Sequence, residues 1–327
     1  MKRQSNTMEK KGQEEEEVKE QGVQKRQKLD QNNQEKKIDF SVLNERQDQQ
    51  QSYIDKLKLN SFNALIEMKG RKDCPKCKCS RKYFCYDCYI PLNDDLATVP
   101  RVDLPIEVTV YIYLLELYFN RLRHPKEKIS KSSIVASKIV APEKVQIVHE
   151  MDISSLRDDD EDYDSVVLLF PTDDAQEVIK MSEEELAKIK KVVIIDCTWN
   201  QTHHFLKQAN VKKIKKIKIQ TEKTVFWRYQ RISEANLATI EALYYFFRDY
   251  DVNKNCSGDY AKYDGKYDNL LYYYAFNYKL IQYEYVEGSK KDKKFIRMDN
   301  YIKGRDEPEQ DTKHHKPAYL AQNDKKE

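Results

Sequence analysis

The stretch VVIIDCTW, residues 192–199, decides how this sequence folds. Four consecutive β-branched residues are typical of a strand that is buried on both faces of a parallel sheet. Asp196 follows this run directly, at the carboxyl end of the predicted strand, where open α/β sheets place ligands and catalytic groups. An Asp in this position can equally cap the next helix. The stretch therefore predicts an α/β fold and one candidate site residue.

Further strands and helices are expected on both sides of this run. Apolar and β-branched runs predict strands at residues 106–118, 145–148, 166–170 and 192–195. Helical periodicity predicts helices at residues 53–68, 237–250 and 270–281. Ser182 followed by three glutamates predicts another helix start. The alternation of strands and helices favours an α/β fold with a largely parallel sheet.

The composition predicts folded segments extended by polar ones. Of the 327 residues, 39% are hydrophobic and 35% are charged, which is polar for a compact globule. Residues 1–52 are rich in Gln, Glu and Lys and poor in aromatic residues, so we expect a disordered tail. A second, charged tail is expected over 287–327. Between the tails we expect a helix and a cysteine module over 53–100 and the main domain over 101–286.

Several classes of protein are excluded by the same inventory. No run reaches the roughly 18–20 apolar residues of a membrane span, so no membrane contact is expected. The first residues lack the apolar segment of a secretion signal. In such a chain, seven cysteines point to metal binding or chemistry before disulfides. The net charge of +3 is too small to identify a partner by itself.

Two C-x-x-C pairs, Cys74 with Cys77 and Cys85 with Cys88, are separated by a short loop. Four thiolates at this spacing fit a closed tetrahedral zinc site, which predicts a small N-terminal zinc-binding module. A redox C-x-x-C would not need the second pair. Cys79 is an alternative to Cys77 as a ligand. Because four protein ligands leave no open position on zinc, the expected role is structural or in nucleic-acid docking.

Four segments carry polar or aromatic groups at the ends of predicted elements. FPTDDA at 170–175 and DCTWNQ at 196–201 each end a strand. FWRYQ at 226–230 places a cation among aromatic rings, which suits stacking on a base or an adenine ring. LATIEA at 237–242 opens a helix, with two polar side chains near its positive end. Each segment alone has an ordinary structural explanation, but the four in this order do not.

Together these segments resemble the DTW-domain family, the tRNA-uridine aminocarboxypropyltransferases. The family pattern is Pro-Thr-x-x-Ala, then Asp-x-Thr-Trp, then an Arg-bearing turn, then Leu-Ser-Thr-x-Glu-Ala; here Ala238 stands where Ser is usual. RHPKE at 123–127, followed by KSS at 131–133, resembles the His-Pro-x-Glu segment of the family, and the cysteine pairs match as well. YDNLL at 267–271 resembles the eukaryotic branch that modifies a D-loop uridine. The resemblance covers roughly residues 70–285 and identifies 101–286 as the catalytic DTW domain.

The resemblance implies a SPOUT-like α/β fold with a C-terminal trefoil knot that binds S-adenosylmethionine. It also implies transfer of the 3-amino-3-carboxypropyl group to N3 of uridine, with release of methylthioadenosine. The catalytic residues expected from it are Asp196, Thr198 and Trp199. Asp196 is either the general base for N3 or the group that orients the ammonium of the cofactor. The expected cofactor-binding residues are Pro171, Thr172, Ala175, Ile195, Asp196, Arg228, Leu237, Thr239 and Glu241.

A lysine-rich run at 211–219 is the main candidate for contact with RNA. Such a run can be a solvated face with an apolar stripe, but the resemblance makes a track for tRNA phosphates the sharper hypothesis. The target base has to leave the folded tRNA before N3 can be reached. The expected RNA-binding residues are Arg123, His124, Lys131, Lys212, Lys213, Lys216 and Arg231. KRQKL at 25–29 resembles a nuclear-import patch, so we expect the nucleus, with the cytoplasm as the alternative.

Two other functions stay open at this point. A protein with the same fold and cofactor that moves the methyl group would be an RNA methyltransferase. A zinc-stabilised RNA-binding protein would need no catalysis at all. The presence of Asp196, Thr239 and Glu241 favours an enzyme, because a protein that only binds RNA need not retain them.

Overall fold

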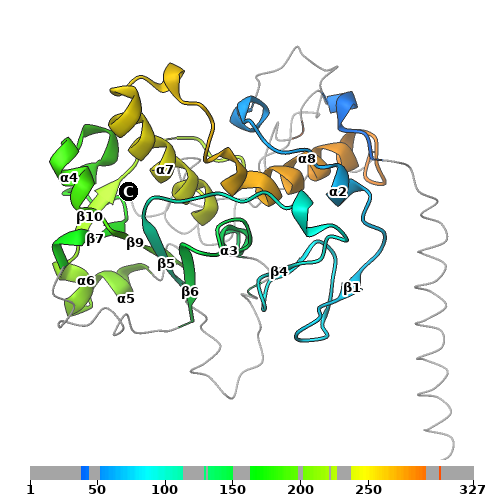
Figure 1. The fold of residues 1–327 in the computed structure, drawn as a ribbon, viewed down its shortest axis with the longest axis horizontal. Helices are drawn as coiled ribbons and strands as arrows, with labels where there is room; N and C mark the ends of the chain where they lie inside the picture. Colours follow the sequence, from blue (N-terminus) through cyan, green and yellow to red (C-terminus); the bar gives the residue numbers. More distant parts are fainter. Residues whose placement is uncertain are drawn as a thin grey trace, which may run out of the picture. The chain divides into compact units, whose positions relative to one another are not determined.

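The fold is built on a parallel sheet with the strand order β6-β5-β9-β7-β10-β8 (Figure 1). The structure is a computed structural model, and it describes residues 38–43, 52–112, 129, 132–149, 163–197, 202–220, 222–226, 237–291 and 302. The strands of this sheet are β5 (Glu107–Ile112), β6 (Val145–Val148), β7 (Val166–Leu169), β8 (Gln176–Glu177), β9 (Lys191–Asp196) and β10 (Lys215–Lys218). All of its neighbouring strands are parallel.

Strand β9 lies between β5 and β7 and is buried on both faces. Val192 and Ile194 pack into the larger hydrophobic cluster, whereas Val193 packs into a second cluster on the opposite face. This alternation is what a β-strand with two covered faces requires. Full burial of each such side chain stabilises the fold by about 1.5–3 kcal/mol. The prediction of a buried parallel strand from the VVII run is confirmed.

Helices cover both faces of the sheet (Figure 1). The face with Val192 is covered by α3 (Val135–Val140), α4 (Glu183–Lys188) and α7 (Thr239–Cys256), and α8 (Tyr272–Val286) packs into the same hydrophobic cluster. The face with Val193 is covered by α5 (Thr202–Leu206) and α6 (Ala209–Lys213). The architecture is therefore mixed α/β with a parallel sheet, as expected. In the part of the chain that is described, no helix is long and apolar enough to cross a membrane.

The segment 53–68 differs from the expectation of one amphipathic helix. It forms a 3₁₀ turn at Tyr53–Lys56 and the one-turn helix α2 (Asn63–Ile66), with extended chain between them. The backbone N–H of Lys58 donates to Asp268 (2.6 Å), and that of Asn60 donates to Asn269 (2.9 Å). Because side chains before α8 satisfy these donors, the backbone does not need a continuous helix here.

Residues 70–92 form two small antiparallel ribbons. In one, β1 (Lys72–Asp73) pairs with β2 (Ser80–Arg81); in the other, β3 (Phe84–Cys85) pairs with β4 (Ile90–Pro91). Phe84 meets Tyr273 edge-on at 4.8 Å between ring centroids, and Tyr83 meets Phe276 at 4.9 Å. The cysteine module therefore shares the hydrophobic core of the sheet through α8. Shorter 3₁₀ turns are found at Leu96–Thr98, Tyr163–Ser165, Val178–Lys180, Tyr260–Lys262 and Asp268–Leu271.

Part of the segment predicted to be a disordered tail is described. Phe40–Leu43 forms a 3₁₀ turn, and the ring of Phe40 meets Phe276 of α8 edge-on at 5.9 Å. Residues 1–37 and 44–51 lie outside the described residues, as does most of the predicted tail after residue 291.

The amino ends of α4 and α7 are capped differently. At α4, Ser182 Oγ accepts the Glu185 N–H (3.2 Å) and the Glu185 carboxylate accepts the Ser182 N–H (2.9 Å), a complete capping box. The N–H of Ser182, together with Lys215, lowers the pKa of Glu185 to about 2. At α7, the Glu241 carboxylate accepts the Ala238 N–H (2.8 Å), but alanine has no oxygen to return the bond. Helix α7 therefore has half of a capping box.

Replacing Ala238 with Ser should complete this box. Ala238 has the extended backbone of an N-cap residue (φ −65°, ψ 149°). The added hydroxyl should stabilise the fold by about 1 kcal/mol, and Ser182→Ala at α4 should destabilise it by a similar amount. In a thermal melt, these changes correspond to shifts of about 2–4 °C in opposite directions. A lower melting temperature for Ala238→Ser would mean that this buried position has no room for the hydroxyl.

Candidate functional site

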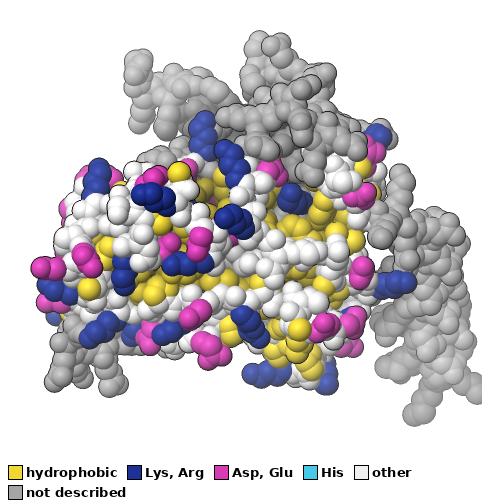
Figure 2. Space-filling view, turned by 45° about the horizontal axis from the view of Figure 1, so that its top comes forward, with side chains coloured by type: hydrophobic (Ala, Val, Ile, Leu, Met, Phe, Trp, Pro, Cys, Tyr) yellow, Lys and Arg dark blue, Asp and Glu magenta, His cyan; other side chains and the backbone are white. Residues whose placement is uncertain are grey.

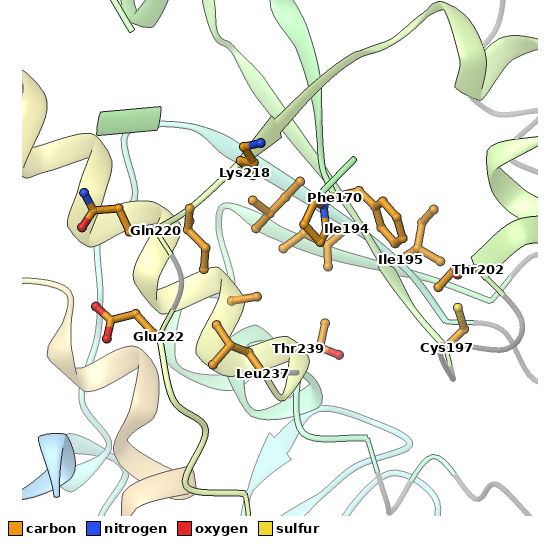
Figure 3. A pocket seen from close by; sticks show the side chains of 14 residues that line it. Phe170, Ile194, Ile195, Cys197, Thr202, Lys218, Gln220, Glu222, Leu237 and Thr239 are labelled. Carbon is orange, nitrogen blue, oxygen red and sulfur yellow. The ribbon is translucent and has the colours of Figure 1, made fainter. Parts of the chain in front are cut away.

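A cavity of about 330 Å³ lies at the carboxyl ends of β7, β9 and β10, beside the amino end of α7 (Figure 3). Parallel α/β sheets bind their ligands at this edge. The lining residues are Leu169, Phe170, Pro171, Ile194, Ile195, Cys197, Thr202, Lys218, Ile219, Gln220, Glu222, Leu237, Thr239 and Ala242. Most of them are apolar, and the hydroxyls of Thr202 and Thr239 add hydrogen-bonding groups. Small-molecule sites have this size and this balance of apolar and polar groups.

Asp196 ends β9 directly behind Thr239, which lines the cavity. One carboxylate oxygen of Asp196 accepts a hydrogen bond from the Ser132 hydroxyl (2.6 Å), and the other accepts one from the Thr239 hydroxyl. Asp196 is paired with Ile112 of β5 in the sheet, so its backbone position is fixed by the strand register. The carboxylate is thus oriented by hydroxyls from two separate segments, the start of α7 and the segment before α3. We refer to Ser132, Asp196 and Thr239 as the carboxylate clamp.

Glu241 is fully buried, and four protein groups donate hydrogen bonds to its carboxylate. Besides the Ala238 N–H, it accepts hydrogen bonds from the Tyr53 hydroxyl (2.8 Å), the Thr224 hydroxyl (2.6 Å) and the Val225 N–H (3.0 Å). Burial raises the pKa of Glu241, and these donors oppose the rise. Glu241 does not line the cavity; it joins the start of α7 to segments around Tyr53 and Thr224.

The turn after β7 closes the cavity on another side. Pro171 lines the cavity, and the next residues form a tight turn in which the Thr172 N–H donates to Phe170 O (2.9 Å) and the Ala175 N–H donates to Thr172 O (3.1 Å). Ala175 is buried, which agrees with the need for a small side chain in this turn. The carbonyl of Ile217 in β10 accepts the Phe170 N–H (2.9 Å) and holds the turn against the neighbouring strand.

The structure brings together residues that are distant in the sequence. Of the predicted cofactor-binding residues, Pro171, Ile195, Leu237 and Thr239 line the cavity, and Asp196 contacts Thr239. Thr198, Trp199 and Arg228 lie outside the described residues.

The structure also adds residues to this site that sequence reasoning did not place there. Cys197, Thr202, Lys218, Gln220 and Glu222 line the cavity, and Ser132 holds Asp196. The only sequence signal was the position of Ser132 in the segment 131–133, and of Cys197 inside the motif that follows β9.

The lysine-rich run divides between a helix end and a strand. Lys212 and Lys213 end α6 and are exposed, and Lys216 lies in β10 with its ammonium on the carbonyl of Lys212 (2.6 Å). Lys215 is instead paired with Glu185 (3.0 Å). Arg123, His124, Lys131 and Arg231 lie outside the described residues.

A candidate metal centre lies in the cysteine module. The Sγ atoms of Cys74, Cys77, Cys85 and Cys88 all lie within 4.8 Å of one another. Cys74 and Cys85 are buried, whereas Cys79 is exposed and is not part of the group. This geometry selects Cys77 rather than Cys79 as the fourth donor. Four thiolates so close together repel one another unless a cation lies between them, and Zn²⁺ prefers four sulfur ligands in a tetrahedron. The donor set therefore fits zinc.

The backbone around the cysteines supports this interpretation. The residue after each pair, Lys78 (φ 60°) and Tyr89 (φ 58°), has a left-handed conformation that turns the chain sharply around the cluster. The backbone N–H of Cys79 lowers the pKa of Cys77 to about 6, which favours its thiolate. Burial raises the pKa of Cys88 to about 12. A bound divalent cation would deprotonate such a thiol on binding.

The cysteine pair at 77 and 79 allows a matched test of the metal centre. Wild type and Cys79→Ser should each contain about one zinc ion per chain, as a four-thiolate site binds one ion. Cys77→Ser should lose the zinc and melt at a lower temperature, because metal binding contributes to folding free energy. Elemental mass spectrometry of the purified proteins gives the stoichiometry. Loss of zinc in Cys79→Ser would contradict the assignment.

Comparison with known proteins identifies the family. The DTW domain family matches residues 82–282. The curated tRNA-uridine aminocarboxypropyltransferase 1 of Rattus norvegicus is 31% identical over 273 residues, which cover 70% of this chain and 83% of the relative. The protein of the same name from Xenopus laevis is 30% identical over 269 residues (70% and 87%), and that from Homo sapiens is 29% identical over 263 residues (68% and 81%). No solved structure matches significantly. The chain therefore belongs to the DTW domain family and is similar to its members named tRNA-uridine aminocarboxypropyltransferase 1.

Proposed function

We propose that this protein transfers the 3-amino-3-carboxypropyl group of S-adenosylmethionine to N3 of a D-loop uridine in tRNA. The observation that carries the proposal is the carboxylate clamp, which places Asp196 of the family motif beside a cavity of ligand size. The names of the similar proteins supply the reaction and the tRNA. The resemblance of residues 267–271 to the eukaryotic branch supports the D-loop uridine.

S-adenosylmethionine is the proposed occupant of the cavity. Apolar side chains from β7, β9 and α7 suit the adenine ring, and the hydroxyls of Thr202 and Thr239 suit the polar arm of the cofactor. Backbone groups of the turn at 170–175 and of the start of α7 would hold the cofactor, together with the predicted residue Arg228. When bound, the cofactor supplies a methylene carbon that its sulfonium makes open to attack.

Asp196 is the proposed acceptor of the uridine N3 proton. N3 carries a proton and is a poor nucleophile until that proton is removed, and a positioned carboxylate can remove it. The carboxylate clamp orients Asp196, since Ser132 and Thr239 each hold one oxygen. Thr198 and Trp199, which follow in the same motif, are proposed to contact the target base. The alternative role for Asp196, in which it holds the ammonium of the cofactor, predicts a different effect of mutation.

We further propose that the chain has the SPOUT-like topology with a C-terminal trefoil knot. The parallel sheet and a cavity walled by three segments after β7, β9 and β10 are consistent with such a fold. From the basic sequence of residues 25–29 we propose a nuclear location, with the cytoplasm as the alternative.

Contact with tRNA is proposed for Lys212, Lys213 and Lys216. On the face that Figure 2 shows, Lys and Arg side chains of the described residues are interspersed with Asp and Glu. A local cluster of lysines, rather than a uniformly positive surface, is therefore the proposed place where phosphates bind.

The reaction can be tested by mass spectrometry of nucleosides from unmodified tRNA incubated with the protein and S-adenosylmethionine. Wild type should form aminocarboxypropyluridine, and Asp196→Asn should lower kcat about 10²–10⁴-fold, the usual contribution of a general base. Asp164→Asn is a matched control, because Asp164 is exposed and precedes the amino end of β7, whereas the cavity lies at the carboxyl ends of the strands. If Asp196 is the base, the Kd for S-adenosylmethionine stays unchanged in Asp196→Asn; if it holds the ammonium, that Kd rises.

Other products would change the conclusion. A methylated nucleoside would retain the cofactor and make the protein an RNA methyltransferase. If wild-type protein binds tRNA but forms no modified nucleoside, the proposed reaction is wrong and the protein is an RNA-binding module.

Simultaneous replacement of Lys212, Lys213 and Lys216 by Ala should weaken the binding of tRNA regardless of the tRNA sequence. Each lost phosphate contact lowers the slope of log K against log salt by about 0.7–0.9, so the triple variant should lower it by roughly 2–3. Lys262, Lys290 and Lys291, which are exposed and lie later in the chain, provide a control variant with the same change of charge. The slopes are measured by filter binding between about 50 and 200 mM salt. If the two triple variants have equal slopes, Lys212, Lys213 and Lys216 do not form a binding site for tRNA phosphates.

A further inference from the structure

The segment after β10 forms one wall of the cavity. Lys218, Ile219, Gln220 and Glu222 all line it. Figure 3 shows the side chains of Gln220 and Glu222 directed away from the other lining side chains and toward α7. Two of the four lining side chains in this segment therefore extend toward α7. We call these four residues, 218–220 and 222, the cavity wall.

Arg248 of α7 binds the cavity wall through Glu222. Its Nη2 donates to Glu222 Oε1 (2.9 Å) and to Asp249 Oδ1 (2.9 Å). The side chain of Arg248 is 15% exposed and that of Asp249 is 0% exposed. The guanidinium also stacks on two rings, at 4.5 Å from the centroid of Tyr245 and 4.8 Å from that of Tyr260. Arg248 is thus held in one orientation on α7.

Asp249 binds the cavity wall through the backbone. Its Oδ2 accepts the Gln220 N–H (3.4 Å), and its Oδ1 accepts the Tyr260 hydroxyl (3.1 Å). The same hydroxyl lies 3.4 Å from the side-chain oxygen of Gln220. A buried carboxylate is costly unless it is paired and hydrogen-bonded, and here Arg248, Tyr260 and Gln220 supply the partners.

These contacts set the distance between two sides of the cavity. Thr239 and Ala242 line it from the first turn of α7, and Asp249 lies farther along the same helix. A rigid helix therefore connects Thr239 and Ala242 at the cavity to the residues that hold the cavity wall. Cofactor-binding backbone has to be held within a fraction of an ångström for its hydrogen bonds to form.

We propose that Asp249, together with Arg248, is a positioning residue that holds the cavity wall at the place where it binds the cofactor. This inference rests on the proposed function, because it takes S-adenosylmethionine as the occupant of the cavity. A buried ion pair is seldom the most stable solution for a protein interior, since apolar residues of similar volume are often as stable. We therefore assign the Arg248–Asp249 pair the role of holding the cavity wall in a fixed position.

Asp249→Asn removes the charge that pairs with Arg248, and Tyr260→Phe removes one hydroxyl and is the milder change. Asn253→Ala is the matched control on the same helix. The Asn253 amide donates to Val178 O and Met181 O (both 2.8 Å), so this variant also breaks contacts of α7, but with a segment that does not line the cavity. Any faster exchange or weaker cofactor binding that stems only from destabilisation of α7 should appear in Asn253→Ala as well.

Two measurements separate the inference from the proposed function. Hydrogen exchange of peptides over 215–226, without cofactor, reports on the wall itself. Calorimetric titration with S-adenosylmethionine, below the melting transition of every variant, reports on binding. Asp249→Asn should exchange faster over 218–222 and raise the Kd about tenfold, with a several-fold smaller rise in Tyr260→Phe. Asn253→Ala should change neither quantity.

The inference is overturned if exchange over 218–222 in Asp249→Asn equals that of wild type, or if Asn253→Ala raises exchange and Kd as much as Asp249→Asn does. If Asp249→Asn does not fold, the same comparison between Tyr260→Phe and Asn253→Ala decides. Failure of the wild-type protein to bind S-adenosylmethionine would instead remove the proposed function, and the exchange data would still show whether Asp249 holds the wall.

Discussion

The buried carboxylate of Glu241 is the interaction on which the arrangement of the site depends. It accepts hydrogen bonds from an N-terminal residue, Tyr53, from Thr224 and Val225 after the cavity wall, and from Ala238 at the start of α7. A carboxylate without exposure to water destabilises the fold unless such donors surround it. The four donors can meet only if three segments distant in the sequence come together, so Glu241 makes their assembly mutually dependent.

Helix α7 organises the cavity in two ways. Its first turn supplies Thr239, which lines the cavity and holds one oxygen of Asp196. Farther along, Arg248 and Asp249 bind the cavity wall. The sheet supplies the other fixed reference, because the pairing of Asp196 with Ile112 sets where β9 ends. Helix α7 and the pairing of β9 with β5 thus place the groups that the proposed reaction needs.

Much of this fold follows from local pattern. The VVII run, the Ser182 helix start and the apolar periodicity after Leu237 each predict an element that the structure contains. Strand β10 was harder to predict, because its sequence KKIK has one apolar residue and reads as a charged surface; pairing with β7 and β8 on either side makes it a strand. The helix expected over 53–68 was wrong, because Asp268 and Asn269 accept the backbone N–H groups that a helix would use.

By itself, the sequence determined the parallel α/β architecture, the two cysteine pairs at metal-ligand spacing and the motif that marks Asp196, because each depends on residues close together in the chain. The choice of Cys77 over Cys79 came from the tertiary structure. It did not determine which residues share the cavity. Ser132, Thr239 and Asp196 are separated by 64 and 43 positions, yet their side chains are in hydrogen-bond contact. The burial of Glu241 among donors from three segments was likewise visible only in the structure. The tertiary structure decided these roles, because the cost of burying a charge depends on groups that only folding brings beside it.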